Sequence, residues 1–282
     1  MTNRSIVEIR NAHNSRDGDG VAIQRIAGMQ HAGMDPVLMI DELRSDDRQD
    51  FIGGFPPHPH RGMQTLTYMK QGGIVHEDSE GNRGEIRSGG AQWMSAGRGI
   101  IHSEMPTQDS DGLHGFQLWV NLPRAQKMSA PQYRDVPLAG LAHWAEGNTS
   151  VTVIAGDWSF NGSPMTGPLE KLAEQAGIAD AQLAPQAQLT VVTKPQAAVL
   201  GYVYDGDAQV GERSITHQQL FITSQGEQLT LSAGEQGAGV LLFQGMPLKE
   251  PVAHYGPFVM NTAEEIEQAI EDYQSGKFPG GA

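Results

Sequence analysis

The feature that most constrains the fold of this sequence is a rhythm of short strand-like runs separated by glycine-containing turns. In the first half the runs are "TLTYM" (65–69), "GIVHED" (73–78), "GEIR" (84–87) and "FQLWVNL" (116–122). A strand about every ten residues, with glycine at the corners, is typical of a β-sandwich or barrel. The 35 glycines and 16 prolines of the chain also suit many short strands joined by tight turns. We therefore expect an all-β fold.

The same rhythm returns after a polar connection at residues 124–148. The later runs are "SVTVIAG" (150–156), "AQLTVV" (187–192), "AAVLGYVYDG" (197–206), "QLFITS" (219–224), "EQLTLSAG" (227–234) and "AGVLLFQG" (238–245). Their layout loosely repeats that of the first half, and 282 residues are enough for two medium domains. We predict two domains, at residues 1–136 and 149–282.

Two segments have helical patterns. The apolar positions that recur at helical spacing are Leu169, Leu172 and Ala173 in residues 168–178, and Ile266, Ala269, Ile270 and Tyr273 in residues 261–276. The second segment also opens with a capping box formed by Thr262 and Glu265. We expect a C-terminal helix that packs on a β-domain; a helix that binds a partner is the alternative.

The composition narrows the classes of partner and site. A formal charge of −14 disfavours direct binding to nucleic acids and anionic membranes, because these partners are themselves negative. The chain has no cysteine, which excludes disulfides, thiolate metal sites and cysteine nucleophiles. It has no apolar run near the ~18 residues that span a bilayer, and its first residues lack the apolar run of a signal peptide. A cytoplasmic protein is expected.

Two short motifs carry the chemistry. Residues two apart in a strand point to the same side, so His58 and His60 direct both imidazoles into one space. His102 and Glu104 repeat this spacing from a later strand. If these strands face each other, three imidazoles and one carboxylate suit a divalent first-row metal ion. A six-coordinate ion would keep two open positions, which indicates catalysis or sensing rather than a purely structural site.

Other polar residues of the same domain have more ordinary interpretations. A lone H-x-H motif is more often a pair of surface histidines. The presence of a second motif, His102 and Glu104, is what favours a metal ion here. His76 and Asp78 share the spacing but lead into the turn "DSEGN", so we interpret them as a solvated hairpin end. His114 and Gln117 could be hydrogen-bond donors near the site, or polar groups in ordinary buried hydrogen bonds.

Four longer stretches carry a resemblance to a known family. They are "HPHRGMQTLTYMKQGG", "GNRGEIRSGGAQWMSAGRGIIHSEMP", "LWVNLP" and "HYGPFVMNTAEEI". Together they resemble the pirin family of the cupin superfamily over nearly the whole chain. The resemblance implies a bicupin, which has two tandem antiparallel β-barrels with a C-terminal helix, a metal ion in the first barrel and a metal-free second barrel.

The family's ligands fall on His58, His60, His102 and Glu104. The resemblance implies one Fe(II) per chain, for which other divalent first-row metals can substitute. Many cupins have a glutamate ligand where this chain has Gln64. A neutral amide is a poorer ligand, so we expect Gln64 to lie outside the coordination sphere and to form hydrogen bonds beside the site.

The resemblance also implies a function. Bacterial pirin-like proteins are associated with quercetin 2,3-dioxygenase activity, in which dioxygen opens the central ring of a flavonol or a similar enolisable compound. Glu104 could remain a metal ligand or detach to act as a base. An alternative is a non-catalytic, redox-responsive iron protein that binds a transcription factor or a metabolic enzyme. Another cupin reaction is a third possibility.

Overall fold

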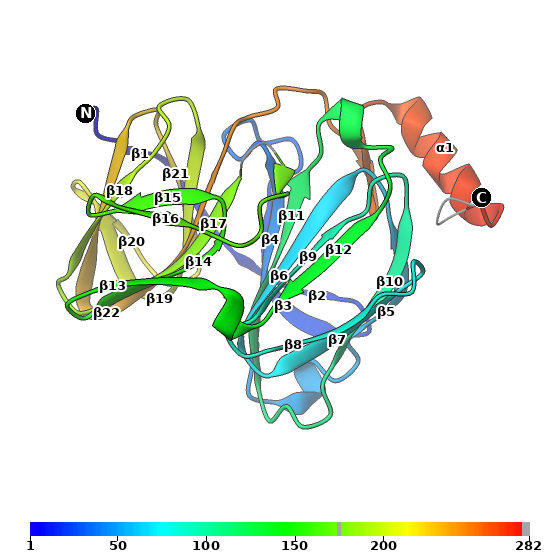
Figure 1. Ribbon diagram of the computed structural model, residues 1–282, viewed down its shortest axis with the longest axis horizontal. Coiled ribbons are helices and arrows are strands. Elements are labelled where there is room, and N and C mark those ends of the chain that lie inside the picture. The colour runs from blue at the N-terminus through cyan, green and yellow to red at the C-terminus, as the bar shows by residue number, and fades with distance from the viewer. Residues whose placement is uncertain (174–175, 278–282) are drawn as a thin grey trace. The chain divides into compact units, whose positions relative to one another are not determined.

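The computed structural model describes residues 1–173 and 176–277, which form antiparallel β-sheets and a C-terminal helix (Figure 1). The chain divides into two compact units. We call the first the N-terminal sandwich; it contains His13–His31, Val37–Ala139 and the chain from Leu248 onward. The second, the C-terminal sandwich, contains Met1–Ala12, Ala32–Pro36 and Gly140–Pro247.

The N-terminal sandwich consists of a larger and a smaller sheet. The larger sheet has the order β12-β9-β6-β11-β4-β3-β2, with β2 (His13–Asp17), β3 (Val21–Ala27), β4 (Val37–Ser45), β6 (Met63–Gln71), β9 (Ala91–Ser95), β11 (Leu113–Asn121) and β12 (Gln132–Val136). The smaller sheet has the order β5-β10-β7-β8, with β5 (Phe55–His60), β7 (Gly73–Asp78), β8 (Arg83–Arg87) and β10 (Ile100–Pro106). Short 3-10 turns occur at Arg48–Asp50, Arg124–Gln126 and Leu138–Gly140.

A shared apolar core holds these two sheets face to face. Strand alternation directs one set of side chains inward from both sheets. The buried members of this core are Val21, Ile23, Leu43, Phe51, Met69, Ile74, Ile86 and Leu113. Burial of each such side chain stabilises the fold by roughly 1.5–3 kcal/mol. The sheets have free edge strands, so this unit is an open sandwich rather than a closed barrel.

The C-terminal sandwich is built from one branched sheet. Its main path is β1-β21-β19-β22-β17-β14-β13, with β15, β16, β18 and β20 attached to it. The bounds are β1 (Ile6–Asn11), β13 (Ala142–Glu146), β14 (Thr149–Ala155), β15 (Asp157–Phe160), β16 (Ser163–Thr166), β17 (Gly177–Leu183), β18 (Gln188–Val192), β19 (Ala198–Val210), β20 (Arg213–Ile215), β21 (Gln219–Thr223) and β22 (Gln228–Gly245). The two apolar runs predicted at 227–234 and 238–245 are therefore parts of a single strand, β22.

The prediction of an all-β fold with two tandem units and a C-terminal helix is confirmed, but the units are sandwiches and not the closed barrels that were expected. One of the two predicted helices is wrong. Residues 168–173 contain no α-helix, and Gly177 already begins β17; residues 174–175 lie outside the described part of the chain. The apolar residues Leu169, Leu172 and Ala173 are buried all the same, and Leu169 forms an isolated β-bridge with Ala155. The C-terminal helix is α1 (Ala263–Gln274), and its predicted capping box is present.

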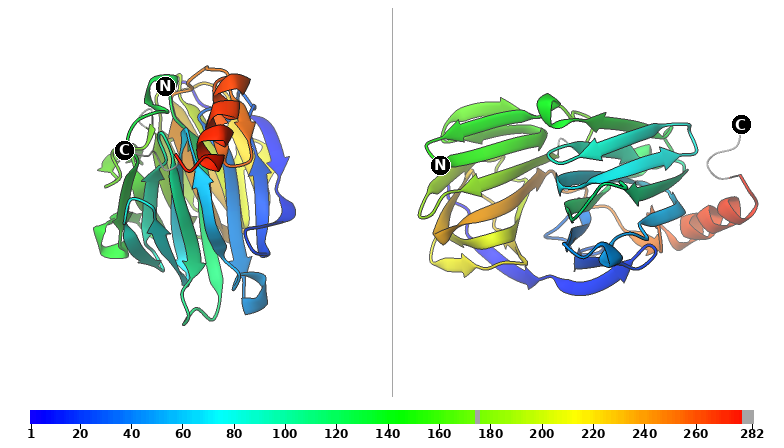
Figure 2. Two further views of the ribbon diagram at one scale, coloured as in Figure 1. Left: turned by 90° about the vertical axis from the view of Figure 1, so that its right-hand side faces the viewer. Right: turned by 90° about the horizontal axis from the view of Figure 1, so that it is seen from below.

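The two units are not the continuous segments 1–136 and 149–282, because the residues at each end of the chain belong to the other unit. Strand β1 belongs to the C-terminal sandwich, where it pairs with β21. The chain from Leu248 onward belongs to the N-terminal sandwich, with β23 (Ala253–Tyr255), β24 (Phe258–Met260) and α1. Figure 2 shows α1 beside the β23–β24 hairpin, against which Ile266 and Ala269 pack. Among the described residues, no helix has the length and apolar character needed to span a membrane.

Candidate metal centre

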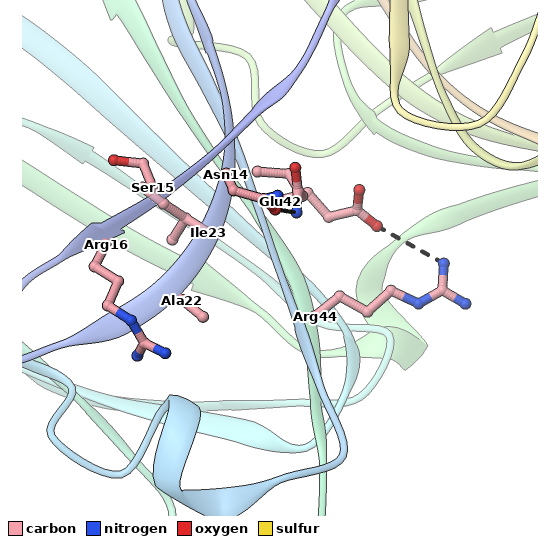
Figure 3. A pocket seen from close by; sticks show the side chains of 8 residues that line it. Asn14, Ser15, Arg16, Ala22, Ile23, Glu42 and Arg44 are labelled. Carbon is pink, nitrogen blue, oxygen red and sulfur yellow. Dashed lines mark hydrogen bonds and ion pairs between the residues drawn. The ribbon is translucent and has the colours of Figure 1, made fainter.

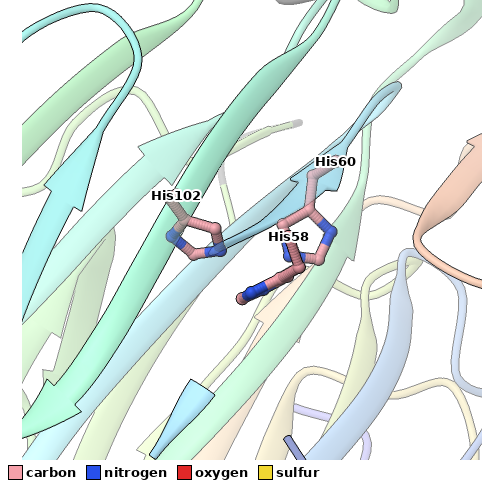
Figure 4. A group of neighbouring side chains, drawn as sticks. All are labelled: His58, His60 and His102. Carbon is pink, nitrogen blue, oxygen red and sulfur yellow. The ribbon is translucent and has the colours of Figure 1, made fainter. Parts of the chain in front are cut away.

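Two neighbouring strands of the smaller sheet bring three histidines together. Strand β5 carries His58 and His60, and β10 runs antiparallel beside it with His102 opposite His58. One ligand nitrogen from each imidazole lies within 4.8 Å of the others. The ring centroids are 4.8 Å apart for His58 and His60, 4.4 Å for His58 and His102, and 4.9 Å for His60 and His102. Figure 4 shows the three rings converging on one space.

Backbone carbonyls set the tautomers of two of these histidines. The Nδ1 of His58 lies 2.8 Å from the carbonyl oxygen of Pro56. The Nδ1 of His60 lies 3.3 Å from the carbonyl oxygen of Pro257. Pro257 belongs to the part of the chain from Leu248 onward, which we call the C-terminal segment. A carbonyl oxygen can only accept, so each Nδ1 carries a proton and the neutral form of each ring has its lone pair on Nε2. Both rings are therefore prepared to bind a metal through Nε2.

The third histidine has a different partner. The Nδ1 of His102 lies 3.3 Å from the Nδ1 of His76. Its Nε2 is buried and has no hydrogen-bond partner within the described chain. A buried polar nitrogen without a partner is costly, and a bound metal ion would remove that cost.

Burial keeps two of the three imidazoles, those of His60 and His102, neutral. Desolvation lowers the pKa of His60 well below 6.5, and the neighbouring His58 lowers it further. Desolvation also lowers the pKa of His102, with His60, His58 and His76 acting in the same direction. Neutral imidazoles are the form that binds metal, so the site is suited to a cation at neutral pH.

Glu104 lies deep in the same sandwich but has a different arrangement. It is 1% exposed, its Oε1 accepts a hydrogen bond from Thr67 Oγ1 at 2.9 Å, and its Oε2 accepts one from Gln117 Nε2 at 2.5 Å. The group whose ligand atoms lie within 4.8 Å contains the three histidines and not this carboxylate. The pairing of β10 with β5 is irregular here, because three residues of β5 oppose two of β10 between His102 and Glu104. Strand β10 pairs with β7 without a break, so the predicted alternation of His102 and Glu104 along β10 is retained.

Two other expected polar residues lie on the larger sheet. Gln64 is 3% exposed in β6, opposite Ser95 of β9. His114 is buried in β11, and its Nε2 lies 3.0 Å from the Oε1 of Glu42. Of the residues predicted beside the site, Gln117 is thus the one that contacts a predicted ligand, Glu104, through a described hydrogen bond.

His76 and Asp78 were missed as neighbours of the site. Their interpretation as a solvated hairpin end is wrong, because both side chains are 0% exposed. Strand β7 pairs with β10 in a register that sets His102 opposite Asp78 and Glu104 opposite His76. The spacing of His76 and Asp78 in "GIVHED" was the one sequence signal that could have placed them near the site. It was not sufficient, because the pairing of β7 with β10 is a long-range contact.

The C-terminal segment is also part of the surroundings of the site. Lys127 is 1% exposed, and its Nζ donates to the carbonyl oxygens of Gly62 and Val259 and to Oδ1 of Asn121 at 2.6–3.0 Å. Burial lowers the pKa of Lys127 to about 8. Gly62 has a φ of +80°, and a Cβ there would lie 2.0 Å from the Val259 carbonyl oxygen. Glycine is required for this close approach.

Two cavities lie on other parts of the molecule. One of about 400 Å³ is formed by strands β2, β3 and β4 (Figure 3). It is lined by Asn14, Ser15, Arg16, Ala22, Ile23, Gln24, Glu42 and Arg44. Another, of about 470 Å³, belongs to the C-terminal sandwich and includes Trp158 and Lys194. Neither lining includes a histidine of the cluster.

The fold and the cluster together define a class of protein. Two antiparallel β-sandwiches, with three converging imidazoles on the first, characterise a bicupin whose first unit could hold a metal ion. Imidazole nitrogens suit Fe, Ni, Cu and Zn. The donor set and the partnerless Nε2 of His102 both fit such an ion.

Comparison with known proteins agrees with this class. The family descriptions "Pirin" and "Pirin C-terminal cupin domain" match residues 20–120 and 178–279. The chain is 48% identical to a Vibrio cholerae protein named "Putative quercetin 2,3-dioxygenase", with 98% of each chain covered. It is 35% identical to the mouse protein named Pirin, over 93% of this chain and 89% of that one. The chain belongs to the pirin family.

Solved structures show the same fold. A crystal structure named quercetin 2,3-dioxygenase, from Acinetobacter baumannii, superposes with a TM-score of 0.89 at 28% identity and covers 99% of both chains. A bacterial pirin from Escherichia coli, solved in complex with nickel(II), superposes with a TM-score of 0.62 at 20% identity, over 85% of this chain and 99% of that one.

Proposed function

We propose that this protein is a mononuclear iron-dependent dioxygenase of the quercetin 2,3-dioxygenase type. Its substrates would be dioxygen and a flavonol or a similar enolisable compound. The observation that carries the proposal is the set of three imidazoles of His58, His60 and His102 that converge on one space. The names of the relatives from Vibrio cholerae and Acinetobacter baumannii support the same activity.

The proposed ligands are His58, His60 and His102, with Glu104 as a fourth that can also act as a base. Bound Fe(II) would supply a Lewis acid that stabilises the deprotonated substrate, together with redox chemistry toward dioxygen. Three neutral imidazoles and one carboxylate leave a divalent ion with a net charge of +1. This charge favours an oxyanion over a neutral hydroxyl group.

Glu104 would remove the proton of the flavonol hydroxyl group. The hydrogen bonds from Thr67 and Gln117 fix the orientation of its carboxylate, and each oxygen of a carboxylate can accept further hydrogen bonds. Burial at 1% exposure excludes bulk water from this group. A general base held in this way contributes about 10²–10⁴-fold to a rate.

The overall reaction is balanced without another reductant or oxidant. The two carbon–carbon bonds at the hydroxyl-bearing carbon of the central ring break, and that carbon leaves with its oxygen as carbon monoxide. Both atoms of dioxygen remain in the ring-opened ester. The proton taken up by Glu104 returns to the product.

The test is anaerobic loading with Fe(II), followed by addition of quercetin and oxygen. We expect metal-dependent loss of the flavonol absorbance with one carbon monoxide released per flavonol consumed. The same assay is repeated with Mn(II), Co(II) and Ni(II), because the affinity of a site follows the first-row series regardless of the native metal. Absence of turnover with every metal would overturn the proposal and would favour the non-catalytic, redox-responsive iron protein.

A further inference from the structure

The side chains of Asp78, His76 and His102 contact one another in this order, and His102 belongs to the candidate metal site. The Nε2 of His76 lies 3.1 Å from the Oδ2 of Asp78. The Nδ1 of the same ring lies 3.3 Å from the Nδ1 of His102. The remaining nitrogen of His102, Nε2, is buried and has no hydrogen-bond partner within the described chain.

The turn after β7 fixes the carboxylate at the outer end of this series of contacts. The Oδ1 of Asp78 accepts hydrogen bonds from the backbone amides of Glu80 and Asn82, each at 3.0 Å. The side-chain Nδ2 of Asn82 donates to both oxygens of Asp78, at 3.1 and 2.9 Å. These donors stabilise the ionised carboxylate and leave Oδ2 facing His76.

The positions of the protons in these contacts follow from the donor and acceptor rules. An ionised carboxylate only accepts, so the Nε2 of His76 carries a proton and its Nδ1 carries a lone pair. That lone pair accepts the proton on the Nδ1 of His102, because two facing lone pairs or two facing protons would repel. The lone pair of His102 must then lie on Nε2, the nitrogen left for a metal ion. Tyr133 stacks on His76 with centroids 4.6 Å apart and limits rotation of the ring.

We propose that Asp78 and His76 are positioning residues that hold His102 in the one tautomer able to bind the metal. The inference rests on the metal site of the proposed function. His58 and His60 depend on backbone carbonyls, which always accept. His102 depends on two side chains instead, so its tautomer can be inverted by substitution.

The variant Asp78→Asn tests this arrangement. The carbonyl oxygen of the new amide stays with the two backbone amides of residues 80 and 82, so its NH2 group faces the Nε2 of His76. That nitrogen must then accept, which moves the proton of His76 to Nδ1 and the proton of His102 to Nε2. Replacing a carboxylate by an amide beside a catalytic histidine selects the wrong tautomer in serine proteases by the same logic.

The first measurement is long-range ¹H–¹⁵N NMR of the metal-free protein at neutral pH, which distinguishes the two tautomers of a histidine. We expect the proton of His102 on Nδ1 in the unmodified protein and on Nε2 in Asp78→Asn. A proton on Nε2 in the unmodified protein would overturn the inference, even if the variant fails to fold. This measurement does not depend on dioxygenase activity.

The second measurement is Zn(II) affinity by competition with a chromophoric chelator. We expect Asp78→Asn to bind about 10–100-fold more weakly, the usual effect of losing a residue that orients a metal-bound histidine. Glu42→Gln is the matched control, since Glu42 is also a 0% exposed carboxylate that faces a histidine, His114, at 3.0 Å. It should retain the affinity and the tautomer of His102.

The outcomes separate this inference from the proposed function. Equal Zn(II) affinity in Asp78→Asn and in the unmodified protein would overturn the inference and leave the dioxygenase proposal intact. An unmodified protein that binds no metal would overturn the dioxygenase proposal, while the NMR measurement would still test the tautomer of His102.

Discussion

His60 and Pro257 lie 197 residues apart in the sequence, yet the Nδ1 of His60 lies 3.3 Å from the carbonyl oxygen of Pro257. The segment that carries Pro257 follows the C-terminal sandwich in the chain but belongs to the N-terminal sandwich. It therefore completes the surroundings of a histidine that lies near the start of the chain. Without this acceptor, either nitrogen of His60 could carry the proton.

Substitution of Gly62 tests the role of the C-terminal segment. The Cβ introduced by Gly62→Ala would lie 2.0 Å from the carbonyl oxygen of Val259, so the backbone that carries Pro257 must shift. We expect a metal affinity at least about 10-fold weaker, because His60 loses its oriented partner. The measurement is the chelator competition described for Zn(II).

The control for this change is Gly162→Ala. Gly162 has a φ of +83°, against +80° at Gly62, but a Cβ added to Gly162 would have no atom within 4 Å. Both variants incur the cost of about 1–2 kcal/mol for a left-handed alanine. If Gly162→Ala weakens metal binding as much as Gly62→Ala, the effect is not due to the C-terminal segment.

Removal of one imidazole tests the ligand set directly. His58→Ala deletes the most accessible of the three rings, so the fold should persist while bound Fe(II) falls from about one per chain to a small fraction. Metal analysis after anaerobic loading and desalting measures this. His217→Ala removes an exposed histidine from the C-terminal sandwich and should leave the metal content unchanged. Retention of iron by His58→Ala would contradict the assignment.

Glu104→Gln separates proton removal from metal binding. The amide keeps the shape of the side chain but cannot take up the proton of the substrate. We expect kcat to fall by about 10²–10⁴-fold. The three imidazoles should still hold iron, at reduced affinity, so rates are compared at equal metal content. Full activity in this variant would exclude Glu104 as the base.

The buried histidines predict how the stability of the metal-free protein depends on pH. The pKa values of His60 and His102 lie below 6.5 in the folded protein because burial disfavours the charged rings. Between the folded and unfolded pKa values the unfolded chain binds more protons, so the free energy of unfolding falls as the pH falls. The loss begins as the pH drops through about 6.5, where an unperturbed histidine titrates.

Urea denaturation in the presence of EDTA, at pH 7.5 and at points down to pH 5, measures this dependence. The ordinary carboxyl groups titrate mostly below this range. Replacing His60 by leucine removes one of the two groups and should make the dependence shallower. A midpoint that stays constant or rises as the pH falls would contradict the burial of neutral imidazoles.

Much of this architecture could be predicted from local pattern. Period-two alternation and glycine corners predicted the strands, and a capping box at Thr262 and Glu265 predicted the C-terminal helix. The helix predicted at 168–178 shows the limit of this approach. Its apolar residues fit a helical face, but Leu169 is buried without a helix and forms a β-bridge with Ala155, and the chain enters β17 at Gly177. Tertiary burial overrode local propensity there.

The candidate site was likewise predicted only in part. The spacing of His58 and His60 determined that both rings enter one space, since alternation along a strand is a local property. The neighbours of His102 are decided by strand register, which depends on packing over the whole sandwich. The pairing of β7 with β10 buries His76 and Asp78, although their sequence context resembles a solvated turn.

The sequence by itself determined the fold class, the family resemblance and the convergence of His58 and His60, because each depends on residue type and short spacing. The pairing of β10 with β5 adds His102 to them, and that pairing is a tertiary contact. Only the tertiary structure decided which groups orient those imidazoles. The pairing of β10 with β5, the contact of His76 with His102 and the approach of Pro257 to His60 each join segments distant in the chain. Such contacts follow from the packing of whole sheets, which no local pattern encodes.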